Sequence, residues 1–201
     1  MNETFYAFDK ALLDFVHNLH AGSCGAFFDG FLKTITHVCD GGVILILLGL
    51  AFVCFRKTRR NGLAILLGLL IELIVVNLVI KTAVMRPRPY YDETSIFYQY
   101  WLDVGFGKEI DFGSFPSAHS SSIFATCLPI FVYRDKKWSW TAILFALIIA
   151  FSRIYIAVHY PSDVVGGVIV GIICSIIAIL IVNAIYRYCE NKEGKIANLL
   201  H

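Results

Sequence analysis

Two histidines of this chain stand in short strings of residues that suit phosphate chemistry. His119 ends the string FPSAH at residues 115–119, and His159 lies between Arg153 and Asp163. An imidazole can act as a nucleophile or as a proton donor, and a guanidinium binds two phosphate oxygens with its planar fork. Together the two strings predict a site for phosphate transfer.

The string around His159 combines three groups at a spacing that favours chemistry. Arg153 precedes His159, and Pro161 and Asp163 then begin an apolar stretch. Because Asp163 falls in a first helical turn, it can reach back to the His159 ring and hold one nitrogen protonated, which leaves the other as a nucleophile or base. A single histidine in a loop is more often structural, but this combination favours a functional site.

The string around His119 predicts the start of a helix. Pro116 suits a first helical turn, and an apolar run follows Ser122. The N–H groups of that turn attract an anion, the Ser117 hydroxyl adds a donor, and His119 is expected to face the bound group. Taken alone, the string would favour a capped helix with an incidental histidine.

A third string places positive charge upstream. Lys81 precedes Arg86 and Arg88, and prolines at 87 and 89 end the helix there. A terminal lysine can extend its ammonium to the membrane surface, but that explains neither arginine. An anionic ligand explains all three cations.

The chain that must position these residues is too apolar for a soluble domain. Of its 201 residues, 58% are hydrophobic and 16% are charged, with a mean hydropathy of +0.70, whereas soluble domains are about 45 to 50% apolar. The lengths of its apolar stretches predict a single all-α integral membrane domain over residues 1–201, a helical bundle of about five spans. These stretches are residues 42–55, 63–85, 121–133, 138–156 and 164–186.

The remaining segments are expected at the membrane surface. Residues 1–40 carry too many charges for a lipid-exposed span, and their apolar positions recur at helical spacing, so we expect interfacial helices. The outer loop at residues 86–116 is rich in aromatic and acidic residues and is either a lid or a packing segment. The six cysteines show no metal-binding spacing, and Cys24 and Cys39 can pair only if both face an oxidising space.

Basic residues predict the orientation of the bundle. Lysines and arginines fill the loops at 56–60 and 134–137 and follow the last span from Arg187 onward. By the positive-inside rule these segments are cytoplasmic. The upstream cations and Arg153 then fall on the outer side, so we expect the site on the extracytoplasmic face of the cell membrane.

Two features inside the apolar stretches are interpreted as packing. Glu72 lies in the second span, where we favour a protonated or interhelically bonded carboxyl over a functional one. Gly167 and Gly171 form a Gly-xxx-Gly pattern. We expect it to allow close helix packing within the monomer rather than a dimer contact.

The three strings resemble the signature of the phosphatidic acid phosphatase type 2 superfamily, which also includes bacterial haloperoxidases. That signature reads Lys, six residues and Arg-Pro; then Pro-Ser-Gly-His; then Ser-Arg, five residues, His, three residues and Asp. The departure here is Ala118 in place of Gly, which we expect to narrow the phosphate pocket without abolishing activity. Every spacing agrees, and the matching residues are Lys81, Arg88, Pro89, Pro116, Ser117, His119, Ser152, Arg153, His159 and Asp163.

The resemblance implies a role for each of these side chains. It makes His159 the nucleophile that forms a phosphohistidine, Asp163 the residue that orients it, and His119 the acid that protonates the leaving oxygen. It implies no metal ion and no cofactor. The residues that it assigns to the phosphoryl oxygens are Lys81, Arg88, Ser117, Ala118 and Arg153.

The implied activity is hydrolysis of a lipid phosphate or diphosphate, because the strings lie at headgroup depth, where a tail can stay in the bilayer. Similar small proteins are bacterial undecaprenyl diphosphate phosphatases and phosphatidylglycerophosphate or phosphatidate phosphatases, and we favour the polyprenyl diphosphate. A non-hydrolytic lipid or anion transporter is the alternative from another class, although transporter sites usually lie near the bilayer midplane. The expected partners are a membrane lipid phosphate and the bilayer, without nucleic acid; the oligomeric state is left open.

Overall fold

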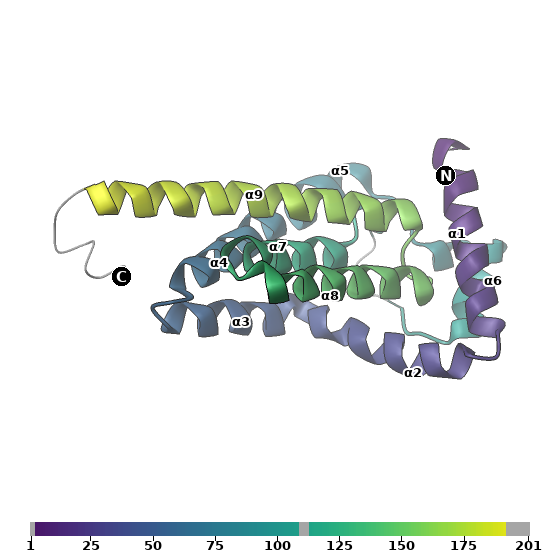
Figure 1. Cartoon of the computed structure of the whole chain (residues 1–201). Coiled ribbons are helices and arrows are strands. Elements are labelled where there is room, and N and C mark those ends of the chain that lie inside the picture. The colour runs from purple at the N-terminus through teal and green to yellow at the C-terminus, as the bar shows by residue number, and fades with distance from the viewer. Residues whose placement is uncertain (1–2, 109–112, 192–201) are drawn as a thin grey trace.

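The computed structural model describes residues 3–108 and 113–191, and these residues form helices without a strand (Figure 1). The expected all-α fold is confirmed. The helices are α1 (Glu3–Ala21), α2 (Gly25–Ile35), η1 (Thr36–Gly42), α3 (Val43–Cys54), α4 (Arg59–Glu72), η2 (Leu73–Ile80), α5 (Lys81–Val84), η3 (Pro89–Tyr91), α6 (Ile96–Val104), α7 (Ala118–Tyr133), α8 (Lys136–Tyr155) and α9 (Pro161–Asn191).

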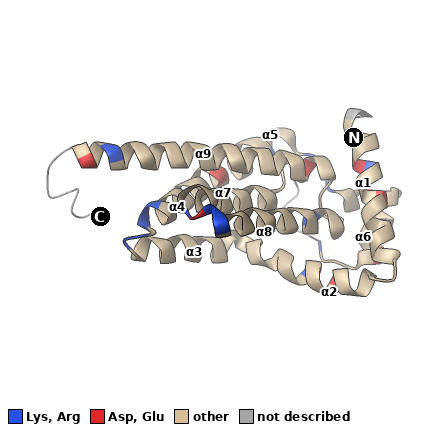
Figure 2. Ribbon diagram, viewed as in Figure 1, with Lys and Arg blue, Asp and Glu red and all other residues tan. Residues whose placement is uncertain are grey.

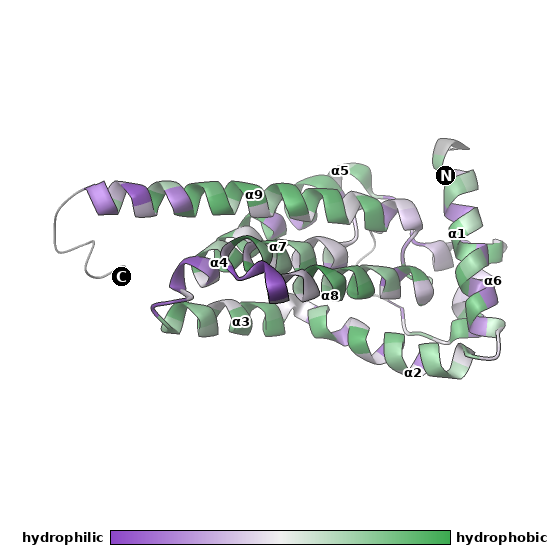
Figure 3. Ribbon diagram, viewed as in Figure 1, coloured by the Kyte–Doolittle hydropathy of each residue, from purple (hydrophilic) through white to green (hydrophobic). Residues whose placement is uncertain are grey.

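The helices are long and apolar enough for a membrane bundle. Four stretches qualify as spans, Gly25–Cys54, Arg59–Val84, Lys136–Tyr155 and Pro161–Asn191, and the shorter apolar helix α7 lies among them. Hydrophobic residues cover the middle of the bundle, whereas hydrophilic residues concentrate toward the ends of the long helices (Figure 3). The chain is therefore a multi-pass membrane protein built as a helical bundle.

Close contact between α7 and α9 depends on two glycines. A Cβ atom at Gly167 would lie 2.4 Å from the Ser117 carbonyl oxygen, and one at Gly171 would lie 2.4 Å from the Ser121 carbonyl oxygen. No side chain fits there, so the backbones of the two helices touch. The expected role of the Gly-xxx-Gly pattern within the monomer is confirmed, and this contact brings the starts of the two helices together.

The N-terminal helices frame one end of the bundle. In Figure 1, α1 crosses the ends of the long helices beside α6, whereas α2 runs alongside α8 and continues through η1 into α3. Leu13 and Val16 of α1 are buried with Phe97 and Trp101 of α6. The described part of the outer loop therefore packs against α1; residues 109–112 of that loop lie outside the described residues. The interfacial placement of residues 1–40 stays a prediction.

Basic residues gather at the end of the bundle away from α1 (Figure 2). They occupy the α3–α4 and α7–α8 connections and the last part of α9, and residues 192–201 beyond it lie outside the described part. The described basic residues at this end are Arg56, Lys57, Arg59, Arg60, Arg134, Lys136, Lys137 and Arg187. The three segments predicted to share one side of the membrane therefore do share one end of the bundle. All described cysteines are free, with Cys24 exposed and Cys39 buried.

Candidate active site

The connection between α8 and α9 presents His159 to the interior. Ala157 has a φ of +52°, a left-handed conformation that turns the chain sharply after α8. Pro161 then begins α9, so only a short segment separates the two helices. His159 is 1% exposed, and Val158 before it is fully buried. The histidine is thus held by a tight, buried turn.

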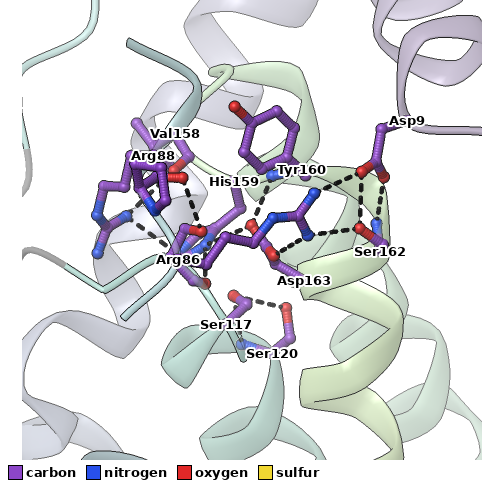
Figure 4. A network of polar contacts seen from close by, with 12 residues as sticks. Asp9, Arg86, Arg88, Ser117, Ser120, Val158, His159, Tyr160, Ser162 and Asp163 are labelled. Carbon is purple, nitrogen blue, oxygen red and sulfur yellow. Dashed lines mark hydrogen bonds and ion pairs between the residues drawn. The ribbon is translucent and has the colours of Figure 1, made fainter. Parts of the chain in front are cut away.

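Hydrogen bonds define the state of the His159 ring (Figure 4). Its Nδ1 lies 2.8 Å from the backbone carbonyl oxygen of Ser114, which can only accept a hydrogen bond. The proton therefore sits on Nδ1, and Nε2 carries the lone pair. Nε2 faces the Arg88 guanidinium, with 3.2 Å between Nε2 and Nη1.

Asp163 differs from its expected position relative to this ring. Its Oδ2 lies 3.7 Å from Nδ1 of His159, which is too long for a hydrogen bond. The carboxylate is already engaged, because Oδ2 accepts from the backbone N–H of Tyr160 at 2.9 Å and Oδ1 accepts from Arg86 at 2.6 Å. The Ser114 carbonyl, and not Asp163, therefore sets the tautomer.

Burial and positive neighbours keep His159 neutral. Burial lowers the pKa of its imidazole well below 6.5, and the charges of Arg88, Arg153, Lys81 and His119 lower it further. The same neighbours show that residues from all three strings of sequence converge on this ring. A neutral imidazole with its lone pair on Nε2 is the form that can attack an electrophile.

Two of the predicted phosphate ligands are buried arginines. Arg88 is 2% exposed and donates to the Val158 carbonyl at 3.1 Å, so it is fixed beside the histidine turn. Arg153 is 1% exposed and donates to Thr36 Oγ1 at 2.6 Å. Lys81 begins α5 and packs its aliphatic chain toward Gly113. The structure thus brings all three cations around one site.

The start of α7 forms another wall of the site. Ser117 is the N-cap of the helix, and its Oγ accepts from the backbone N–H of Ser120 at 3.4 Å and from the Ser120 hydroxyl at 3.0 Å. The Ser117 hydroxyl proton is thereby left to donate elsewhere. The backbone N–H of Ser117 donates to the Asp163 carbonyl at 3.0 Å, which ties the two helix starts together. Ala118 follows as the first residue of α7.

His119 has a carboxylate partner that sequence reasoning missed. Its Nε2 lies 2.9 Å from Oδ1 of Asp40, and Oδ2 of Asp40 lies 2.6 Å from Nδ1 of His37. The His119 side chain is 13% exposed, and that of Asp40 is 53% exposed. Asp40 is distant in sequence and lies at the kink inside η1, just before α3, so no local pattern pairs it with His119.

An apolar cavity of about 470 Å³ adjoins His119. Its walls come from η1, α3, α4, η2 and the start of α7, and the apolar part includes Ile46, Leu66 and Leu70. Glu72 lines the same cavity, is 2% exposed, and accepts hydrogen bonds from the Ser121 and Ser122 hydroxyls of α7. The interhelical bonding expected for Glu72 is therefore confirmed.

Arg86 of the third string and Asp9 of α1 join the site through contacts that the sequence did not predict. Arg86 contacts Asp163, as described above, and Arg86 Nη2 lies 2.7 Å from Oδ2 of Asp9 on α1. Asp9 is fully buried. Sequence reasoning assigned Arg86 to an anionic ligand and Asp9 to the membrane surface, whereas the structure pairs Arg86 with the carboxylates of Asp9 and Asp163. Neither contact has a local signal, since both carboxylate partners of Arg86 lie 77 positions away in sequence.

Comparison with known proteins places the site in context. A model of the PAP2 superfamily matches residues 61–187. The chain is 29% identical to the undecaprenyl-diphosphatase BcrC of Bacillus subtilis over 150 residues, which cover 72% of this chain and 70% of that protein. It is 26% identical to a lipid A 4'-phosphatase of Porphyromonas gingivalis over 150 residues, which cover 72% of this chain and 62% of that protein.

The fold also resembles a solved structure. The crystal structure of Aquifex aeolicus LpxE matches with a TM-score of 0.72 at 24% sequence identity, covering 89% of this chain and 98% of that one. The three strings lie within the matched residues 61–187, whereas Asp9 and Asp40 lie before them.

Proposed function

The chain belongs to the PAP2 superfamily and is a membrane lipid phosphatase, and we propose that it hydrolyses a polyprenyl diphosphate on the extracytoplasmic face through a phosphohistidine. The observation that carries the mechanism is the state of His159. Its Nδ1 proton is engaged by a carbonyl 2.8 Å away, and its Nε2 lone pair faces Arg88. The nucleophile is therefore oriented toward the place where a phosphoryl group would bind.

The proposed reaction has two steps. In the first, Nε2 of His159 attacks phosphorus, the bond from phosphorus to the leaving oxygen breaks, and His119 gives that oxygen its proton. In the second, water attacks the phosphohistidine, His119 takes a proton from the water, and inorganic phosphate leaves. Lys81, Arg88 and Arg153 stabilise the charge on the phosphoryl oxygens.

Ser117 and Ala118 complete the proposed phosphate site. Ser117 donates its hydroxyl proton to a phosphoryl oxygen, and Ala118 lies where the helix start approaches the anion. Asp163 influences the reaction through its charge beside the His159 ring. No metal ion or cofactor takes part in the proposal.

The cavity beside His119 supports a lipid substrate. His119 protonates the leaving group, so the leaving group must lie on its side of the phosphate. An apolar cavity of about 470 Å³ lies on that side, at the surface of the spanning helices α3 and α4. An isoprenoid or acyl chain suits such walls. The polyprenyl diphosphate is favoured because a similar protein is named for that substrate.

The basic end of the bundle supports the proposed orientation. Lysines and arginines of three segments gather away from the site (Figure 2), and such residues prefer the cytoplasmic side. A single cysteine introduced at Lys108, in a variant without the native cysteines, should react in intact cells with a membrane-impermeant maleimide. If that cysteine is protected from the reagent, the orientation is opposite to the one proposed.

Phosphate release from the purified protein in detergent with EDTA tests the activity. We expect release from undecaprenyl diphosphate to persist in EDTA and to vanish in His159→Ala. Release that needs a divalent metal, or that survives the substitution, would contradict the mechanism. Binding without release would point to a transporter. A panel with phosphatidylglycerophosphate and phosphatidate then ranks the substrates, and a preference for either would replace the polyprenyl diphosphate.

A further inference from the structure

Arg86 holds a position that the signature does not explain. It lies two residues before Arg88, which alone has the signature spacing from Lys81. We infer that Arg86, held by Asp9 of α1, is a positioning residue that fixes Asp163 beside the nucleophile, so that the N-terminal helix completes the active site. This inference rests on the proposed function, because it assigns a role within the same reaction.

The guanidinium of Arg86 bridges two carboxylates (Figure 4). Nη1 donates to Asp163 Oδ1 at 2.6 Å and to Ser162 Oγ at 2.7 Å, and Nη2 donates to Asp9 Oδ2 at 2.7 Å. The Asp9 and Asp163 side chains are both fully buried, and that of Arg86 is 18% exposed. Two buried carboxylates joined through one cation form a fixed unit, because separating any pair would leave a buried charge without its partner.

Asp9 also holds the start of α9. Its Oδ1 accepts from the backbone N–H of Ser162 at 2.8 Å, and its Oδ2 accepts from the Ser162 hydroxyl at 2.8 Å. A carboxylate at a helix N-terminus satisfies an N–H group that has no partner within the helix, and it is stabilised by the helix dipole. Here the carboxylate comes from another helix, so α1 is tied directly to the turn that carries the nucleophile.

The ring of Tyr160 supports the planar cation. The Arg86 guanidinium carbon lies 4.2 Å from the centre of that ring, a distance that permits a cation–π contact. Lysine has a point charge, and it cannot make a planar stack and bind two carboxylates in fixed directions at the same time. The site therefore requires arginine specifically, rather than any positive charge.

Arg86 is expected to affect catalysis by fixing the Asp163 carboxylate. With Oδ1 on Arg86 and Oδ2 on the Tyr160 N–H, the carboxylate is held 3.7 Å from His159 Nδ1. It is thereby kept from competing with the Ser114 carbonyl for the Nδ1 proton. Arg86 also offsets the negative charge that would otherwise favour protonation of the nucleophile.

The test compares Arg86→Gln, Arg86→Lys and Asp9→Asn in the full-length protein, with phosphate release measured against lipid diphosphate concentration. We expect kcat to fall on the order of 10- to 100-fold in Arg86→Gln with KM changed by less than about threefold, since the substitution misplaces a group behind the nucleophile. Arg86→Lys should restore only part of the loss. The control is Asp14→Asn, on the same helix, whose carboxylate bonds to Tyr100 and Lys10 instead; it should leave kcat within about twofold of wild type.

The pH profile separates positioning from folding. The charged groups near His159 are Arg88, Arg153 on α8, Lys81 on α5, His119 on α7 and Asp163 on α9. Loss of Arg86 leaves the Asp163 charge unopposed, which favours the protonated, inactive imidazole, so the acidic limb of kcat/KM should move to higher pH. In Asp9→Asn, Asp163 is the remaining carboxylate that pairs with Arg86, so the acidic limb of kcat/KM in this variant should stay in place or move to lower pH.

A double-variant cycle completes the test. If both residues act as one unit, Arg86→Gln combined with Asp9→Asn should lose little more than Arg86→Gln alone. The inference would be overturned if the losses of kcat in the two single variants multiply in the double variant. It would also be overturned if the acidic limb of Arg86→Gln does not move, or if Arg86→Lys restores full activity. Failure of the proposed function is distinguishable, because the wild-type protein would then release no phosphate, or His159→Ala would retain its activity.

Discussion

The two halves of the site treat their histidines in opposite ways. His159 is 1% exposed, and both of its ring nitrogens contact buried groups. His119 is partly exposed, and its partner Asp40 is more than half exposed. The half with His159 is therefore a closed, fixed structure, and the half with His119 opens toward an apolar cavity and the solvent.

This difference matches what each proposed role requires. A nucleophile must keep one tautomer and stay neutral, which burial among cations and a fixed carbonyl provide. A proton donor must regain or lose a proton in each cycle, which contact with water allows. A lipid leaving group also needs an open path beside the donor. The contrast thus agrees with the proposed mechanism, in which attack occurs on the buried side and the lipid exchanges on the open side.

Substitution of the buried histidine should have the largest effect. His159→Asn is expected to lower kcat by at least about 10⁴-fold, because no other described side chain occupies its position as nucleophile. The measurement is phosphate release, together with trapping of a radiolabelled phosphoenzyme after an acid-free quench. Wild type should form the label and His159→Asn should not. A phosphoenzyme that persists in the variant would place the nucleophile elsewhere.

Substitution of the open histidine should depend on the leaving group. His119→Asn is expected to lower kcat by about 10²- to 10⁴-fold on a lipid monophosphate, whose alkoxide leaves poorly without a proton. The loss should be smaller on a lipid diphosphate and smallest on an aryl phosphate such as p-nitrophenyl phosphate. His159→Asn should lose activity equally on all three. An equal loss on all three in His119→Asn would remove the distinction between the halves.

Local patterns were enough to predict the all-helical membrane fold and to mark the three strings that meet around His159. Apolar stretches predicted the helical bundle, and the Gly-xxx-Gly pattern predicted close helix packing within the monomer, because both patterns are formed by residues near each other in sequence. The structure also brings His159, Asp163, Arg88, Arg153 and Lys81 together as the three strings predicted. Their catalytic roles stay proposals.

The partners of the histidines could not be predicted in the same way. The Ser114 carbonyl that holds His159 is a backbone group, which every residue has, so its use leaves no sequence signal. Asp9 and Asp40 were interpreted as charges at the membrane surface because nothing in their neighbourhood marks them. Their contacts cross 153 and 79 positions to Ser162 and His119. Tertiary packing alone creates such pairs.

The contact between α7 and α9 sets the distance between the two halves. Gly167→Ala would place a methyl group 2.4 Å from the Ser117 carbonyl oxygen, so the helices must separate. We expect a destabilisation of about 1 to 3 kcal/mol and a larger loss of kcat than of stability, because both helix starts move. Thermal unfolding in detergent and phosphate release measure the two effects. Gly30→Ala is the matched control, since a methyl group there meets nothing within 4 Å. Similar losses in both variants would show that the glycine contact does not control the geometry of the site.

The smallest effect should come from the exposed carboxylate beside His119. Asp40 favours the protonated imidazole, so Asp40→Asn should make His119 lose its proton at lower pH, and the alkaline limb of kcat/KM should move to lower pH. An exposed pair of this kind contributes about 0.2 to 1 kcal/mol, so we expect the rate near neutral pH to fall by no more than about fivefold. His37→Gln is the control, because His37 contacts the other oxygen of Asp40 and not His119. A profile that stays in place in Asp40→Asn would show that His119 works without this carboxylate. A shift as large as that of a buried group would show instead that substrate binding closes the open half over the pair.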